Sequence, residues 1–136
     1  MTLVRDECVN VPDAPMAATV ALRLRREFLR AARSRRCAAE GFLLQARRRD
    51  PDEPGGCLIR FGLTCSRKLG NAVVRNRARR RLRALARALL PRHGRPGWDY
   101  VLVGRPGVTV DRPMARLEDD LRRALDRVHG QQASRR

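Results

Sequence analysis

The stretch from residue 54 to residue 98 contains no acidic residue, and this absence constrains the fold more than any other feature of the 136-residue sequence. Its basic residues include a row spaced four apart, formed by Arg75, Arg79, Arg83 and Arg87. Like charges at this spacing in a helix repel each other by roughly a few tenths of a kcal/mol per pair. Helix stability alone does not explain such a row, so we expect the arginines to face a polyanionic partner.

The same stretch carries the apolar pattern of a long amphipathic helix. The apolar positions fall within about a third of the helix circumference at 100° per residue, and they are Ala78, Leu82, Leu85, Ala86 and Leu89. The exposed face is expected to hold Asn76, Arg79, Arg80, Arg83 and Arg87. Arginines that recur at roughly 6 Å along this face can meet successive phosphates of a nucleic acid. Pro91 and Gly94 mark the expected end of the helix.

The segments around this helix predict further strands and helices. We expect strands over residues 41–46, 57–65 and 98–104, a first helix over 22–36, and a last helix from about Pro113 to Val128. In the second strand, one face is expected to carry Cys57, Ile59, Phe61, Leu63 and Cys65. This order predicts a single α+β domain with helices packed on a small sheet. We place a flexible leader at residues 1–20, the folded domain at 21–129 and a flexible basic tail at 130–136.

The charge of the chain favours a nucleic-acid partner. With 31 basic and 14 acidic residues, the formal net charge is +17, which produces a positive potential that attracts polyanions. Lys68 is the single lysine, so almost every cation is an arginine, whose planar fork can bind a phosphate through two hydrogen bonds.

Other classes of protein are less consistent with the sequence. No stretch approaches the roughly 18 to 20 apolar residues of a membrane span, and the first 20 residues lack the apolar run of a secretion signal. The cysteines show no metal-binding spacing, and they are Cys8, Cys37, Cys57 and Cys65. We expect these cysteines to be free thiols in a cytoplasmic protein that contacts no membrane.

The segment from Ser66 to Arg87, SRKLGNAVVRNRARRRLRALAR, closely resembles the signature of the bacterial ribonuclease P protein family. The hallmark of that family is an arginine-asparagine-arginine triplet, seen here as Arg75-Asn76-Arg77. The resemblance extends to the strand segments RFGLTCS and DYVLVGRPG and to the early helix around Phe28, so it covers roughly residues 22–128.

This resemblance implies both a fold and a function. The implied fold is a single α-β-β-β-α-β-α domain with a small four-stranded sheet and a left-handed βαβ crossover, like ribosomal protein S5 domain 2 and against the usual handedness rule. The implied function is that of the protein subunit of ribonuclease P, which binds the catalytic RNA and the 5′ leader of precursor tRNA. It would assist endonucleolytic removal of the leader to give the mature 5′ end. The implied partners are the catalytic RNA, in a 1:1 complex, and precursor tRNA.

The resemblance also assigns roles to residues. Contacts with the catalytic RNA are expected from Arg67, Lys68, Asn71, Arg75, Asn76, Arg77, Arg79, Arg80 and Arg83. A leader cleft between the first helix and the sheet is expected to contain Phe28, Gln45 and Arg105, with Phe28 as an aromatic floor for a base. Without the resemblance, Phe28 would be interpreted as an ordinary core residue. For Arg105, an exposed loop position is as good an interpretation as a contact with a leader phosphate. Gln45 and Ala32 stand where the family often has aromatic residues.

The protein itself is not expected to be the catalyst. Hydrolysis by a protein nuclease requires carboxylates or histidines that converge on a metal or a phosphate, whereas Glu118, Asp119 and Asp120 are consecutive on a helix and point in different directions. The chemistry would belong to the RNA, which would hold Mg²⁺, and the protein alone would bind no metal and no cofactor.

Two other functions are also compatible with parts of the sequence. A ribosomal or ribosome-assembly protein would have the same charge, size and mixed fold. A DNA-binding helix-turn-helix regulator is less consistent, because a strand precedes the basic helix here.

Overall fold

Two strands rich in apolar residues form the centre of the sheet. β4 (Ile59–Thr64) and β5 (Trp98–Gly104) pair in parallel, and β5 also pairs antiparallel with β3 (Phe42–Arg48). The edges are β1 (Thr19–Ala21), parallel to β4, and β2 (Arg35–Ala38), antiparallel to β3. The order across the sheet is therefore β1-β4-β5-β3-β2. This computed structural model describes residues 19–134, with side chains described as far as residue 130.

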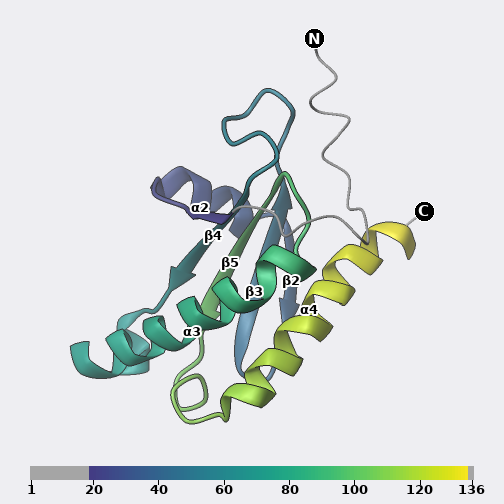
Figure 1. Cartoon of the computed structure of the whole chain (residues 1–136). Coiled ribbons are helices and arrows are strands. Elements are labelled where there is room, and N and C mark those ends of the chain that lie inside the picture. The colour runs from purple at the N-terminus through teal and green to yellow at the C-terminus, as the bar shows by residue number, and fades with distance from the viewer. Residues whose placement is uncertain (1–18, 135–136) are drawn as a thin grey trace.

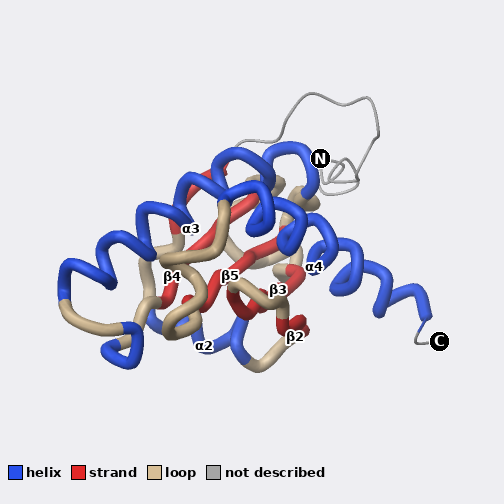
Figure 2. Tube along the Cα trace, turned by 90° about the horizontal axis from the view of Figure 1, so that it is seen from below, coloured by secondary structure: helices blue, strands red, loops and turns tan. Residues whose placement is uncertain are grey.

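The helices cover both faces of the sheet. They are α2 (Arg25–Ala32), the short 3₁₀ helix η1 (Arg67–Leu69), α3 (Ala72–His93) and α4 (Met114–Ser134). α3 and α4 cross one face, and α2 lies on the other (Figures 1 and 2). α3 connects the parallel neighbours β4 and β5. The handedness of that crossover and the likeness to ribosomal protein S5 stay predictions.

The main core lies between the sheet and the pair α3 and α4. The predicted apolar stripe of α3 is buried in it, with Leu82 and Ala86 at 0% exposure. The alternation predicted for β4 is also confirmed, since Ile59 and Phe61 face this core. A smaller apolar cluster on the α2 side holds Leu22, Ala31, Val101, Phe28 and Val103. The predicted α+β architecture is therefore confirmed.

The prediction of a four-stranded sheet is wrong, because β1 adds a fifth strand beside β4. A three-residue strand is too short to carry a periodic pattern, so only its pairing with β4 defines it. The first helix is also shorter than the predicted range 22–36, because the chain turns after Ala32 and residues 35–38 pair with β3.

The two predicted flexible ends extend beyond the described part of the chain. Within the predicted leader, Thr19 and Val20 belong to β1, and residues 1–18 lie outside the described residues. Within the predicted tail, α4 continues as far as Ser134, and residues 135–136 lie outside the described part. Flexibility at either end stays a prediction.

The prediction that all four cysteines are free thiols is only partly confirmed. Cys37 and Cys65 are free and buried, as predicted. Cys57 is disulfide-bonded, which contradicts the prediction for that residue, and Cys8 lies outside the described residues. None of the helices between residues 19 and 134 is long and apolar enough to cross a membrane.

A buried aromatic cluster fixes the C-terminal half of α4 against β5. The hydroxyl of Tyr100 accepts a hydrogen bond from the backbone N–H of Arg95 and lies 2.8 Å from Nε2 of His129. The His129 ring also meets Trp98 edge to face, with ring centroids 4.4 Å apart. Burial, helped by the nearby charges of Arg95 and Arg35, lowers the pKa of His129 to about 3. The imidazole is therefore neutral in the folded protein at neutral pH.

Because the pKa of His129 is lower in the folded protein than in the unfolded chain, the unfolded chain binds the extra proton first as the pH falls. The stability contributed by the neutral ring is complete above pH 6.5 and is lost progressively toward pH 3. We expect the free energy of unfolding to fall by about 2 kcal/mol between about pH 7.5 and pH 5, measured by urea unfolding. His129→Gln should remove most of this pH dependence, and an unchanged dependence in that variant would contradict the assignment.

Candidate nucleic-acid interface

Two local caps fix the start of α3 and the loop before it. The Ser66 side chain accepts a hydrogen bond from the backbone N–H of Lys68 at 3.3 Å. Oδ1 of Asn71 accepts one from the backbone N–H of Val74 at 3.0 Å, which makes Asn71 the N-cap of α3. Arg67 and Lys68 are exposed directly before the helix. The predicted RNA contact of Asn71 stays a prediction, beside this structural role.

The predicted contact residues on α3 differ in exposure. Asn76, Arg77, Arg80 and Arg83 are exposed, whereas Arg75 and Arg79 are half-buried. In the part of the chain that the structure describes, none of these arginines forms a salt bridge. Their positive charges are therefore not neutralised by neighbouring carboxylates there, as the sequence predicts.

Several arginines other than these predicted contact residues stabilise the fold instead. Arg47 binds Glu53 at 2.7 Å, and Arg112 binds Asp120 at 2.7 Å. Arg81 points from α3 toward the loop before α4, where its Nε donates to the carbonyl of Thr109 at 3.0 Å. These contacts distinguish structural arginines from those on the exposed face of α3, whose donors remain available to phosphate.

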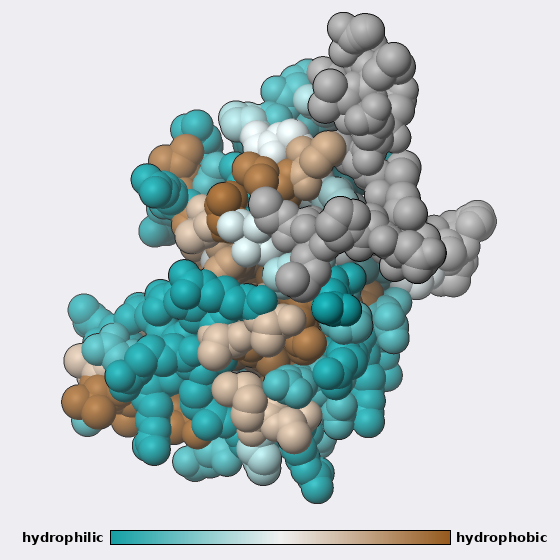
Figure 3. All heavy atoms as spheres, viewed as in Figure 1, coloured by the Kyte–Doolittle hydropathy of each residue, from teal (hydrophilic) through white to brown (hydrophobic). Residues whose placement is uncertain are grey.

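A groove runs between α2, the β1–β4 edge of the sheet and α3. It has a volume of about 270 Å³ and joins the aromatic ring of Phe28 to the side chains of Arg79, Arg83 and Arg87. In the view of Figure 3, hydrophilic residues cover much of α3, and hydrophobic residues are exposed at its N-terminal end and above the helix. The groove thus combines an aromatic surface with positive charge, the two features that bind single-stranded nucleic acid.

The three predicted cleft residues do not share this groove. Phe28 is half-buried, and its ring packs directly over Gly62, where a Cβ atom would lie 2.3 Å from Cε1 of the ring. Gln45 is buried in β3, and Arg105 is half-buried after β5. Neither Gln45 nor Arg105 lines the groove. The structure therefore brings Phe28 together with arginines of α3, and roles of Gln45 and Arg105 in a leader cleft stay predictions.

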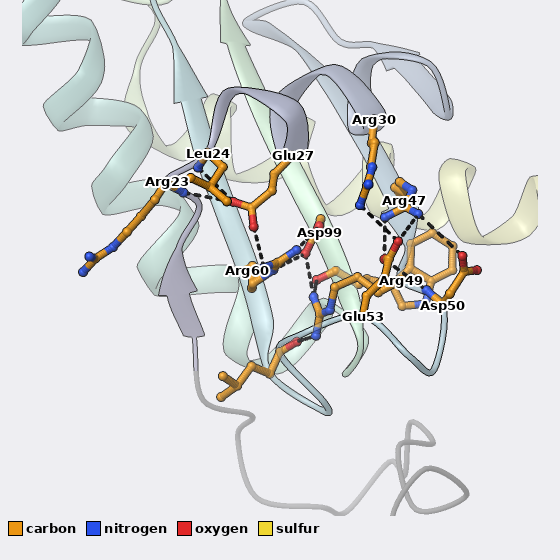
Figure 4. Close-up of polar contacts among 12 residues, drawn as sticks. Arg23, Leu24, Glu27, Arg30, Arg47, Arg49, Asp50, Glu53, Arg60 and Asp99 are labelled. Atoms are coloured by element: carbon orange, nitrogen blue, oxygen red, sulfur yellow. Dashed lines mark hydrogen bonds and ion pairs between the residues drawn. The ribbon is translucent and has the colours of Figure 1, made fainter.

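A chain of ion pairs anchors α2 to the sheet (Figure 4). Glu27 of α2 binds Arg60 of β4 at 2.8 Å, and Arg60 binds Asp99 of β5 through two further contacts of 2.8 Å. Asp99 in turn binds Nη1 of Arg49 at 2.6 Å. Burial alone would raise the pKa of Glu27, but hydrogen bonds from two backbone N–H groups and the charge of Arg60 outweigh burial and lower it. Glu27 is therefore held as a carboxylate at neutral pH.

This chain of ion pairs has no counterpart in the local sequence pattern. The residues are far apart along the chain, since the residue numbers of Glu27 and Arg60 differ by 33 and those of Arg60 and Asp99 by 39. One signal was present: Asp99 is an acid inside the otherwise apolar strand WDYVLVG. A buried carboxylate requires a partner, so its position indicated that a cation must meet it.

The described part of the chain contains no group of three or more histidine, cysteine, aspartate or glutamate side chains that could hold a metal ion. The groove and the exposed face of α3 carry no carboxylate either. These surfaces do not offer the oxygen ligands that Mg²⁺ prefers.

The fold and this surface define a class of protein. A small α+β domain in a chain of net charge +17 presents, beside an aromatic groove, a helix whose arginines form no salt bridge among the described residues. These are the features of a nucleic-acid-binding protein.

Comparison with known proteins identifies the family. The sequence model of the ribonuclease P family matches residues 16–129. The ribonuclease P protein component of Ruegeria pomeroyi is 60% identical over 108 residues, which cover 79% of this chain and 85% of the relative. That of Caulobacter vibrioides is 46% identical over 104 residues, covering 76% and 67%. The solved structure of the ribonuclease P protein from Thermotoga maritima superposes with a TM-score of 0.65 at 26% identity, covering 79% of this chain and 96% of that one. The chain belongs to the ribonuclease P protein family.

Proposed function

We propose that this chain is the protein subunit that binds the catalytic RNA of ribonuclease P through η1 and the exposed face of α3. The observation that carries the proposal is the row of α3 arginines without carboxylate partners among the described residues. Such a row is costly for the helix alone and favourable against a phosphate backbone. One protein would bind one RNA, in the cytoplasm.

The groove beside α3 supports a second contact, with the 5′ leader of precursor tRNA. A leader is single-stranded, so its bases can stack on an aromatic side chain while its phosphates meet cations. Phe28 supplies the ring, and Arg79 and Arg83 supply charge on the opposite wall. Contact with the leader would favour precursor over mature tRNA, which lacks that segment.

The chemistry of cleavage is proposed to reside in the RNA. Two residues that could be considered for catalysis have structural roles: Asp120 binds Arg112 and the backbone N–H of Gly41, and His129 is buried against Tyr100. Because the groove and the α3 face do not offer Mg²⁺ ligands, the metal ions would be held by RNA phosphates. The protein would neutralise charge and position the substrate.

Phe28→Ala tests the leader contact. In the complex of this protein with a bacterial catalytic RNA, we expect the variant to bind precursor tRNA about tenfold more weakly, the loss of one base–aromatic stack. Binding of mature tRNA should not change. Filter-binding titrations with both tRNAs measure the difference. Equal affinity of wild type and variant for the precursor would contradict the leader assignment, and no leader preference in the wild type would contradict the proposed substrate role as a whole.

A further inference from the structure

Two consecutive residues of α2 contact two positions on the same face of β4. Glu27 binds Arg60, and Phe28 packs over Gly62. Arg60 and Gly62 are two residues apart on one strand, so both face α2. The ionic contact and the aromatic contact are therefore parts of one docking arrangement.

The side chain of Arg60 is held in place by Asp99. Its Nε and Nη2 bind the two carboxylate oxygens of Asp99, the residue directly opposite in the parallel register of β4 and β5. Asp99 is 1% exposed and its Oδ1 also binds Nη1 of Arg49, whose second Nη group donates to the carbonyls of Gly56 and Leu58. A bidentate guanidinium–carboxylate pair has little freedom to rotate. The Nη1 group of Arg60, which binds the carboxylate of Glu27, is therefore held in one orientation.

The polar part of the α2 attachment depends largely on Glu27. A second ion pair of the helix among the described residues, between Arg30 and Glu53, is 3.3 Å long and its arginine is 50% exposed, so it contributes little. The apolar cluster beneath α2 is much smaller than the core beneath α3 and α4. Glu27 also accepts hydrogen bonds from the backbone N–H groups of Arg23 and Leu24 at the start of the helix. One carboxylate therefore caps α2 and fixes it to the sheet.

We propose that Glu27, acting through Arg60, is a positioning residue that sets where the Phe28 ring lies over the sheet and thereby how tightly the groove holds a single-stranded leader. This inference rests on the proposed function, because it assumes that the groove receives the leader. It assigns a substrate-selecting role to an acidic residue that does not line the groove.

Glu27→Gln separates positioning from simple electrostatics, because the two accounts predict opposite signs. Glutamine keeps the shape of the side chain and an oxygen acceptor, but it removes the negative charge. If only net charge mattered, the loss of a carboxylate would strengthen RNA binding. If Glu27 positions Phe28, the affinity of the protein–RNA complex for precursor tRNA falls by about fivefold, while affinity for mature tRNA and for the catalytic RNA is unchanged.

Two further variants control this experiment. Glu118→Gln on α4 makes the same chemical change at a half-exposed site whose partner Arg122 is 4.0 Å away, and it should not weaken precursor binding. Glu27→Asp keeps the charge but shortens the side chain, so it should weaken precursor binding selectively as well. Glu27→Asp keeps the test valid if Glu27→Gln does not fold, as judged by thermal unfolding.

The double variant tests whether Glu27 affects precursor binding through Phe28. In the Phe28→Ala background, Glu27→Gln should change precursor affinity by less than about twofold, because the ring that it positions is gone. A full fivefold loss in that background, or an equal loss for mature tRNA, would overturn the proposal. A wild-type complex without any preference for the leader would instead overturn the proposed function, so the two failures are distinguishable.

Discussion

Asp99→Asn should lower the free energy of unfolding by about 3 to 5 kcal/mol, the cost of breaking a buried ion pair from one side. Asp99 is 1% exposed and binds both Arg49 and Arg60, whose side chains are 2% and 12% exposed. Asparagine is neutral, so the substitution removes the negative charge that these two guanidinium groups now share. The loss is a large part of the roughly 5 to 15 kcal/mol that stabilises a domain of this size. Urea unfolding at neutral pH measures it.

Asp119→Asn is the matched control. Asp119 lies on the exposed side of α4, where its carboxylate meets Arg122 at 3.1 Å and its side chain is 58% exposed. The same substitution there should change stability by less than about 0.5 kcal/mol. A similarly small effect at Asp99 would show that the buried chain of ion pairs does not stabilise the fold as we infer.

The periodic elements of the fold could be predicted from the sequence, because one residue pattern defines each of them. β4 alternates apolar residues, and α3 and α4 repeat them at helical spacing, so burial followed from local pattern. β1 could not be predicted this way, since three residues contain no period and the strand exists only through its pairing with β4. The early strand β2 was likewise assigned to the preceding helix, because Arg35 and Arg36 continue its basic composition.

The candidate site was predictable to a similar extent. The arginine row of α3 was visible as a run of positive charge without acids, and the structure leaves it without salt bridges in the described residues. The groove was not visible, because it joins Phe28 to Arg79 and Arg83, which are brought together only by packing on opposite sides of the β1–β4 edge. The anchoring role of Glu27 also depends on a long-range contact, with Arg60.

Arg77→Ala/Arg80→Ala should weaken binding to the catalytic RNA by about 100-fold or more, at roughly 1.5 kcal/mol or more for each lost charge-assisted hydrogen bond. Both side chains are exposed and make no salt bridge within the described residues, so the double variant should fold normally. Arg75 is half-buried and is a less suitable target. The plot of log affinity against log salt should become shallower by about 1.4 to 1.8, because two phosphate contacts are lost.

Arg123→Ala/Arg127→Ala provides the control for net charge. These two arginines are exposed on α4, four residues apart, and form no salt bridge in the described part of the chain. Their removal takes away the same total charge from a different surface, so the salt dependence of RNA binding should change little. Equal losses from the two double variants would mean that binding follows net charge and that α3 is not a specific interface.

The central claim is that this protein assists an RNA catalyst through α3, and cleavage of precursor tRNA at low, near-physiological Mg²⁺ tests it most directly. The reaction is followed with the bacterial catalytic RNA alone, with the RNA plus wild-type protein, with the RNA plus Arg77→Ala/Arg80→Ala, and with the protein alone. We predict rapid cleavage only for the RNA with wild-type protein, and none by the protein alone. Tight, salt-sensitive RNA binding without any acceleration of cleavage would contradict the claim, and so would cleavage by the protein without the RNA.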